Sequence, residues 1–265
     1  MPLWTLAVRL FIPTGQPRPF LPVMGALAIT VAAIQTFSVL GGAAAAAMMF
    51  VRRVGLSTGA MISVVTLEQL ATGFAKAALV AVAILVAPAP AIFKAAGASL
   101  LLAVLVVFAA LIWAAHSGAA VARLADIAPG WLAHPVRLCG EWTTHLEALR
   151  RPLRFAVAAL LTLGRRVMET IAILCVQKAT GVPVSIEAAL LVIAALALAT
   201  IIPGPPGNVG YYEAVVVLAY GWVGVGKETA VAAALLQHLA FLAAALVPGY
   251  LLLAIRRQSL LQRAH

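Results

Sequence analysis

Three prolines and three glycines interrupt one of the most apolar parts of the chain, in the stretch ATIIPGPPGNVGYYEA at residues 199–214. The prolines lack the amide hydrogen that a helix needs, and the glycines permit turns that are closed to other residues. Glu213 follows in the first turn of the helix expected after this break, where the helix dipole stabilises a carboxylate. Broken helices of this kind hold anionic groups in membrane transporters, whereas the simpler alternative is an ordinary turn between two spans.

Other ionisable side chains lie inside apolar runs. Glu68 and Lys76 are eight residues apart and therefore share one face of a helix. An ionisable group in mid-membrane costs about 2.5 to 3.5 kcal/mol, so it generally faces a cavity or a partner. Lys76 can instead extend its amine to the membrane surface. His238 lies on a face of alanines and leucines and is either a hydrogen-bonded core residue or a ligand.

Arg165, Arg166 and Glu169 form another charged group. The arginines precede the acid by four and three residues, a spacing that permits an ion pair on one helix. A guanidinium fork also suits a lipid phosphate. The pattern leaves open an internal salt bridge, a helix that enters the membrane after the arginines, and a phosphate contact.

Signatures of catalysis are absent from the sequence, which has no GxSxG, HExxH or Walker A pattern and no His, Cys and Asp cluster at metal-ligand spacing. Cys139 and Cys175 are 36 residues apart and are expected to be free thiols. We therefore expect no enzyme activity, no metal and no cofactor.

The composition indicates which elements must position these residues. The 265-residue chain is 64% hydrophobic and 10% charged, with a mean hydropathy of +1.09, whereas soluble domains have about 25% charged residues. A bilayer core needs about 20 apolar residues per helix, and the long runs lack the alternation of a membrane β-barrel. The expected fold is an all-α polytopic membrane protein.

About seven transmembrane helices, between six and eight, fit the hydrophobic pattern. Gly41 and Gly42 lie near the middle of the first, which is longer than one crossing, and favour a hinge or a helical hairpin there. The chain then comprises an N-terminal segment 1–19, a transmembrane domain 20–255 and a basic tail 256–265. The spans are expected at 20–51, 58–86, 97–116, 155–177, 186–202, 211–223 and 229–255, with a Pro/Gly-broken or re-entrant segment near 203–210.

Arginines predict the orientation, since Lys and Arg accumulate in short cytoplasmic loops. The Arg52-Arg53 connection, the loop 117–154 and the C-terminal tail fall on one side if the spans alternate, and that side is expected to be the cytoplasm. Within the loop we expect an interfacial amphipathic helix with Trp131 and Trp142 at headgroup depth. A basic rim facing anionic lipid accounts for the net charge of +10 without a nucleic-acid partner.

Residues 181–253 resemble the membrane region of lysylphosphatidylglycerol synthases and of the stand-alone flippase-like proteins grouped with them. The family pattern here is P-x-x-PGG-x-G-x-x-E, followed by a G-V turn, an Ala-rich helix and a late proline. Asn208 replaces the second glycine of this pattern, and weaker resemblance covers 52–74, where Glu68 is kept and Gln69 stands for an arginine. The matching positions are Pro203, Pro206, Gly207, Gly210, Glu213, Gly224, Val225, Ala230 and Pro248.

Several charges of the family are missing. Upstream of Arg52 the family has a P-x-R-x-G-E-x-x-R pattern, of which the run SVLGGAAAAA retains only Gly42. His238 stands where the last helix of the family often has arginine. These losses leave open a divergent substrate, a degenerate copy, or a site completed by a partner chain.

The resemblance implies a bacterial inner-membrane protein that binds a membrane lipid or lipid-linked intermediate and moves it between leaflets. The synthases transfer aminoacyl groups with a separate soluble domain, which we do not expect here because the sequence ends soon after the last expected span. The alternative is a non-transporting scaffold for a membrane enzyme, either a lipid-modifying enzyme or a glycosyltransferase, and a homo-oligomer is compatible with both. The candidate substrate-binding residues are Glu213, Pro206, Gly207, Asn208, Gly210, Glu68, Lys76, Arg165, Arg166, Glu169 and His238.

Overall fold

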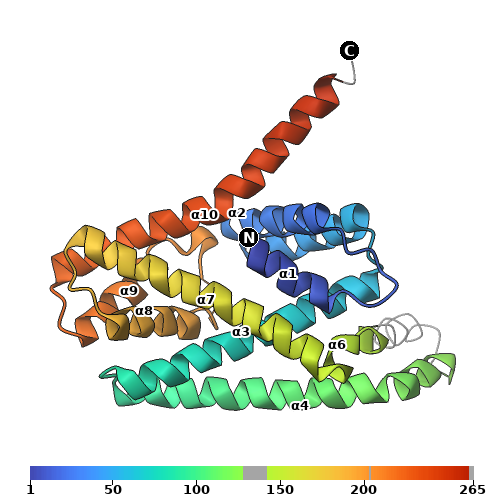
Figure 1. Ribbon diagram of the computed structural model, residues 1–265, viewed down its shortest axis with the longest axis horizontal. Helices are drawn as coiled ribbons and strands as arrows, with labels where there is room; N and C mark the ends of the chain where they lie inside the picture. Colours follow the sequence, from blue (N-terminus) through green and yellow to red (C-terminus); the bar gives the residue numbers. More distant parts are fainter. Residues whose placement is uncertain (128–141, 203, 263–265) are drawn as a thin grey trace. The chain divides into compact units, whose positions relative to one another are not determined.

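The structure, a computed structural model, describes residues 1–127, 142–202 and 204–262, and within these ranges it contains helices and no strand. The all-α fold expected from the sequence is therefore confirmed for this part of the chain (Figure 1). The helices are α1 (Pro2–Phe11), α2 (Phe20–Met49), η1 (Phe50–Val54), α3 (Thr58–Val86), α4 (Ala91–Ile127), α6 (Glu147–Arg150), α7 (Pro152–Thr180), α8 (Ile186–Ala199), η2 (Pro206–Asn208), α9 (Tyr211–Trp222) and α10 (Lys227–Gln262).

Four of the described helices are long and apolar enough to cross a membrane, and the chain is an all-α membrane protein. The shorter helices α8 and α9 have 14 and 12 residues, and α7 carries several charges. The expected number of about seven spans stays a prediction. The four long apolar segments are Phe20–Phe37, Thr58–Val86, Ala91–His116 and Lys227–Ile255.

Prolines set the boundary between α3 and α4. α3 ends at Val86, just before Pro88 and Pro90, as the sequence predicts. α4 is longer at both ends than the predicted span 97–116. The reason is that alanine, arginine and leucine favour a helix whether or not they lie in lipid, so the helix continues beyond the most apolar stretch.

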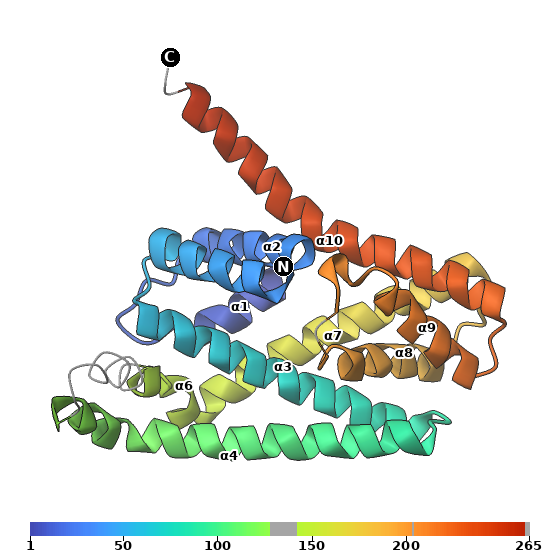
Figure 2. The ribbon, with the colours of Figure 1, turned by 180° about the vertical axis from the view of Figure 1, so that it is seen from behind.

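α2 is not straight. The Cα of Gly42 lies so close to the side chain of Ile34 that a Cβ has no room without a shift, although residues eight apart in a straight helix are separated by about 12 Å. α2 therefore turns back between these residues, and both views draw its two halves side by side (Figures 1 and 2). This agrees with the helical hairpin that Gly41 and Gly42 favour.

The chain forms two compact units, and each is described by itself. Unit 1 comprises Met1–Met24, Phe50–Ala75 and Leu101–Arg165. Unit 2 comprises Gly25–Met49, Lys76–Leu100 and Arg166–His265.

Aromatic side chains form the centre of unit 1. Phe155 of α7 lies 5.7 Å from Phe108 of α4 and 6.0 Å from Phe11 of α1, measured between ring centroids. Trp142 donates from Nε1 to the hydroxyl of Thr66 on α3 at 3.3 Å. Trp131 of the predicted interfacial helix lies outside the described residues. In the described part of the loop 117–154, the structure has the short helix α6.

Small residues let the helices of unit 2 approach closely. A Cβ on Gly249 of α10 would come within 2.6 Å of both the carbonyl oxygen of Ala28 and the Cβ of Ala32 on α2. Contacts through small residues are a common way for membrane helices to associate. The neighbouring Pro248 lacks an amide hydrogen inside α10, and α10 is bent in both views (Figures 1 and 2).

Candidate functional site

Among the described residues of the loop between α8 and α9, 200–202 and 204–210, only the single turn η2 is helical, which confirms the expected break. Left-handed backbone occurs at Gly207, Asn208 and Gly210, with φ of 67°, 55° and 79°. Asparagine tolerates this conformation better than most side chains. The structure therefore explains how Asn208 can replace the second glycine of the motif.

Pro206 and Gly204 shape the first half of this loop. Pro206 is the first residue of η2, where its missing amide hydrogen would have no partner within the turn. The side chain of Asn208 lies against Gly204. A Cβ on residue 204 would collide with Oδ1 of Asn208. Pro203, the first proline of the motif, lies outside the described residues.

Glu213 holds the end of the loop to α9. The amide of Gly210, the N-cap residue of α9, donates to Glu213 Oε2 at 2.8 Å, a contact typical of an acid at the third helical position. Glu213 Oε1 lies 2.7 Å from Nδ1 of His238 on α10. Both carboxylate oxygens are therefore engaged within unit 2.

His238 joins this carboxylate to the loop. Its Nε2 donates to the carbonyl oxygen of Gly207 at 2.8 Å, because a carbonyl can only accept. The bond to Glu213 then requires one further proton, either on Nδ1 or on the carboxyl group. The pair has no net charge in either case, which suits side chains that are 3% and 19% exposed. We call Gly207, Gly210, Glu213 and His238 the loop clamp.

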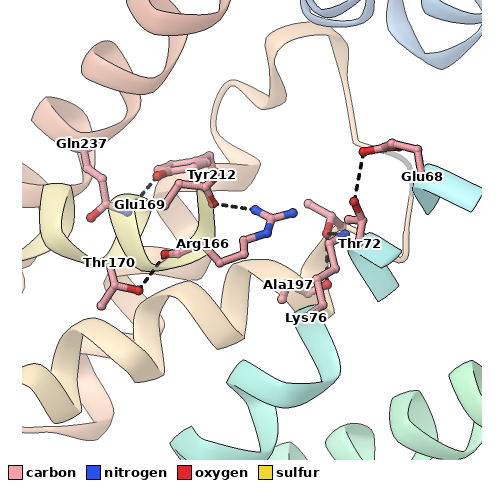
Figure 3. A network of polar contacts seen from close by, with 10 residues as sticks. Glu68, Thr72, Lys76, Arg166, Glu169, Thr170, Ala197, Tyr212 and Gln237 are labelled. Carbon is pink, nitrogen blue, oxygen red and sulfur yellow. Dashed lines mark hydrogen bonds and ion pairs between the residues drawn. The ribbon is translucent and has the colours of Figure 1, made fainter. Parts of the chain in front are cut away.

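Two tyrosines of α9 support the loop clamp. The Tyr212 ring stacks on His238 with centroids 4.4 Å apart, and its hydroxyl accepts from Gln237 Nε2 at 2.7 Å (Figure 3). The Tyr211 hydroxyl donates to the carbonyl oxygen of Ala199 at 2.7 Å and so connects the two ends of the loop. These contacts were not predicted, because they depend on how α8, α9 and α10 pack.

Lys76 of α3 contacts the start of the same loop. Its Nζ donates to the hydroxyl of Thr200 at 2.8 Å, and that hydroxyl donates to the carbonyl oxygen of Ala197 at 3.0 Å (Figure 3). Together with Glu213 and His238, Lys76 makes three ionisable side chains that bind residues in or beside one short loop.

Arg166 and Glu169 form an ion pair on α7, with Nη1 and Oε2 2.5 Å apart (Figure 3). The Arg166 side chain is 17% exposed, and its carbonyl oxygen accepts from the Thr170 hydroxyl at 3.0 Å. The spacing left open three interpretations of these charges, and the structure contains the internal salt bridge between Arg166 and Glu169.

Glu68 and Arg165 belong to unit 1. Glu68 Oε1 accepts from Trp4 Nε1 and from the Thr72 hydroxyl, both at 3.0 Å, and Figure 3 shows the second bond. The guanidinium carbon of Arg165 lies 4.7 Å from the centroid of the Trp4 ring. Trp4, which the sequence analysis did not single out, thus contacts both residues.

The structure brings some of the predicted site residues together and separates others. Gly207, Gly210, Glu213 and His238 are joined by the bonds above, and Lys76 binds the same loop. The prediction that Glu68 and the arginines of α7 line a cavity with Glu213 stays a prediction, because these residues are divided between the two units.

Apolar side chains of the loop are exposed. Ile201, Ile202 and Val209 have 60%, 66% and 66% of their surface accessible. In a membrane protein such side chains contact lipid or a partner. Among the described residues, no group of three His, Cys, Asp or Glu side chains could hold a metal ion.

Comparison with known proteins gives one match. The family model described as lysylphosphatidylglycerol synthase TM region matches residues 1–249, which include the loop and every residue of the loop clamp. The chain matches no curated protein and no solved structure.

Proposed function

The chain belongs to the lysylphosphatidylglycerol synthase TM region family, and from this premise we propose that it binds a lipid or lipid-linked intermediate in the bacterial inner membrane and moves it between leaflets. The family makes it a membrane protein tied to lipid metabolism. A headgroup that crosses about 30 Å of hydrocarbon needs a polar path.

The observation that supports this proposal is the use of ionisable side chains around the loop. Lys76 lies on a long apolar helix, as does His238, and Glu213 begins the short α9. Placing such groups in apolar helices costs free energy, so they are retained where they serve a site. All three hold a non-helical segment whose backbone lacks the hydrogen bonds of a helix.

A translocation assay tests the proposal. Purified protein is placed in liposomes that contain acyl-chain-labelled phosphatidylglycerol, and a membrane-impermeant reductant reports the label that reaches the outer leaflet. Wild type is expected to move label faster than protein-free liposomes, and Gly207→Val to lose most of that activity. Gly221→Val is the matched control, because Gly221 lies within α9 with no neighbour within 4 Å of a built Cβ. Equal rates for wild-type and protein-free liposomes would refute translocation of this lipid.

The hydrogen bonds of Glu213 within the chain favour a second candidate function, a scaffold that binds a membrane enzyme and transports nothing. Both of its oxygens are bonded within the chain, whereas a lipid ligand needs free donors or acceptors. The exposed side chains of Ile201, Ile202 and Val209 would then contact the partner. A scaffold predicts no translocation by wild type and loss of enzyme co-purification after Val209→Asp.

We further propose that the loop 117–154 and the tail 256–265 face the cytoplasm, since both carry arginines. Single cysteines introduced in 123–150 and 256–263, in a chain lacking its two native cysteines, should react with an impermeant reagent only after the cells are permeabilised. Reaction in intact cells would reverse the orientation.

A further inference from the structure

A pocket in unit 1 lies beside α1, and none of its lining residues belongs to the loop that the proposed function uses. It has a volume of about 310 Å³. Two arginines and three leucines line it: Leu6, Arg9, Leu10, Arg18 and Leu161. Leu6, Arg9 and Leu10 belong to α1, Arg18 to the connection that follows it, and Leu161 to α7.

The two guanidinium groups use few of their donors on the residues that the structure describes. Arg9 Nε donates to the carbonyl oxygen of Arg18 at 2.8 Å, and its guanidinium carbon lies 5.7 Å from the centroid of the Phe20 ring. Arg18 Nη2 is buried and has no hydrogen-bond partner among the described residues. Burying an unpaired donor costs about 1 to 3 kcal/mol, and more for a charged group. An acceptor supplied by a ligand would remove that cost.

The charge around the pocket favours an anion. No carboxylate lines it in the part of the chain that the structure describes. Two further arginines contact α1 or the residue that follows it, because Arg165 lies over Trp4 and Arg154 donates to the carbonyl oxygen of Ile12 at 2.7 Å. Like charges at one pocket repel each other, and a bound anion offsets this repulsion.

The leucines indicate which anion. Leu6 is 40% exposed, and with Leu10 and Leu161 it gives the pocket an apolar wall. A free phosphate would lose hydration against this wall and gain no contact from it, whereas an amphiphile can place its apolar part there. Phosphate oxygens match the planar fork of a guanidinium group.

We propose that this pocket binds an anionic phospholipid, with phosphate oxygens accepting from Arg9 and Arg18 and the first part of an acyl chain lying on Leu6. Arg18 is only partly buried, so its guanidinium can turn toward the phosphate without a change in the backbone. The site does not depend on translocation, because a translocating protein and a scaffold could each hold such a lipid.

Lipid binding to the intact protein in detergent, measured by native mass spectrometry, tests the proposal. Phosphatidylglycerol should bind, whereas diacylglycerol, which lacks the phosphate, and inorganic phosphate, which lacks the acyl chains, should bind much more weakly. Arg18→Gln should weaken phosphatidylglycerol binding about ten-fold or more, the loss expected for a charge-assisted hydrogen bond. Arg53→Gln is the matched control, since Arg53 is exposed on η1 and does not line the pocket.

Two results would overturn the proposal. Equal losses in Arg18→Gln and Arg53→Gln would mean that lipid is attracted by net charge alone, and equal binding of inorganic phosphate and phosphatidylglycerol would mean a small-anion site. If Arg18→Gln lowers the Tm of the protein, Leu6→Gln at an exposed position provides the second test and should also weaken binding. Unchanged translocation in Arg18→Gln would separate this site from the proposed function.

Discussion

The loop of unit 2 and the α1 pocket of unit 1 both place charged side chains among apolar ones, but they differ in how the polar atoms are satisfied. In the loop clamp, both oxygens of Glu213 and both nitrogens of His238 have partners in the chain. At the α1 pocket, Arg9 uses one donor and Arg18 Nη2 has no partner among the described residues. Buried polar groups that are fully bonded hold structure, and those that lack a partner are candidates for a ligand.

The most conspicuous sequence motif, the Pro/Gly loop, is therefore not the site whose side chains have unpaired donors among the described residues; that site is the α1 pocket. The Pro/Gly loop has the pattern associated with transport, yet its carboxylate fixes the backbone of the loop. The pocket beside α1 comes from a short segment with ordinary composition. We therefore propose that Glu213 positions the loop and does not itself contact a lipid.

The largest expected effect is on stability, from Glu213→Ala. This change leaves the amide of Gly210 without its acceptor and Nδ1 of His238 without its hydrogen-bond partner. The free energy of unfolding in detergent should fall by about 2 kcal/mol, the loss expected for two hydrogen bonds. Glu187→Ala, at an exposed acid in the first turn of α8, is the control and should change little. Similar losses in both variants would contradict the loop clamp.

Gly207→Ala should have the next largest effect. The residue has φ of 67°, and an L side chain in this region costs about 1 to 2 kcal/mol. Space is not the cause, since a Cβ would meet its nearest neighbour at 3.5 Å. Gly221→Ala makes the same chemical change inside α9 and should raise the Tm slightly. If Gly207→Ala is as stable as Gly221→Ala, the backbone at position 207 does not adopt the left-handed conformation.

Asn208 gives a smaller and more specific test. With φ of 55°, Asn208→Gly should leave the free energy of unfolding nearly unchanged, whereas Asn208→Ala should lower it by about 1 kcal/mol. Thermal unfolding of the two variants measures the difference. A more stable Asn208→Ala would mean that the asparagine does not replace glycine for its backbone conformation.

Much of the fold follows from the sequence, and less of the site does. Long apolar runs predict α3, and the prolines at 88 and 90 predict where it ends, because these signals are local. The break before α9 is local as well. The partnership of Glu213 with His238 joins residues 25 apart, and that of Lys76 with Thr200 joins residues 124 apart. Such pairs depend on packing, which periodicity does not reveal.

Trp4 and Arg18 show the same limit in unit 1. Nothing in the spacing of Trp4 indicates a bond to Glu68, because the two are 64 residues apart. Arg18 belongs to a proline-containing connection, and its position in the sequence does not indicate that it shares a pocket with Leu161. The apolar spans of α4 and α10 end at His116 and Ile255, as predicted, but the helices continue to Ile127 and Gln262, since hydropathy marks the membrane and not the helix.

The smallest expected effect concerns Lys76. Lys76→Met keeps the length of the side chain but removes the exposed bond to Thr200, so the free energy of unfolding should fall by about 0.5 kcal/mol, the low end for a hydrogen bond. Thr200→Val removes the same bond from the other side. The double variant should lose less than the sum of the single losses, because the shared bond is counted only once. If the loss in the double variant equals the sum of the two single losses, the bond between Lys76 and Thr200 contributes nothing to the free energy of unfolding.

The most direct measurement of the central claim compares translocation by wild type, Glu213→Gln and Glu213→Ala in the same liposomes. A glutamine can accept from the Gly210 amide and donate to Nδ1 of a neutral His238, whose Nε2 still donates to Gly207, so it keeps every bond of the loop clamp without the carboxylate. We predict that Glu213→Gln retains translocation close to wild type and that Glu213→Ala loses most of it. Loss of translocation in Glu213→Gln, with a Tm equal to that of wild type, would contradict the account by showing that the carboxylate acts directly on the lipid.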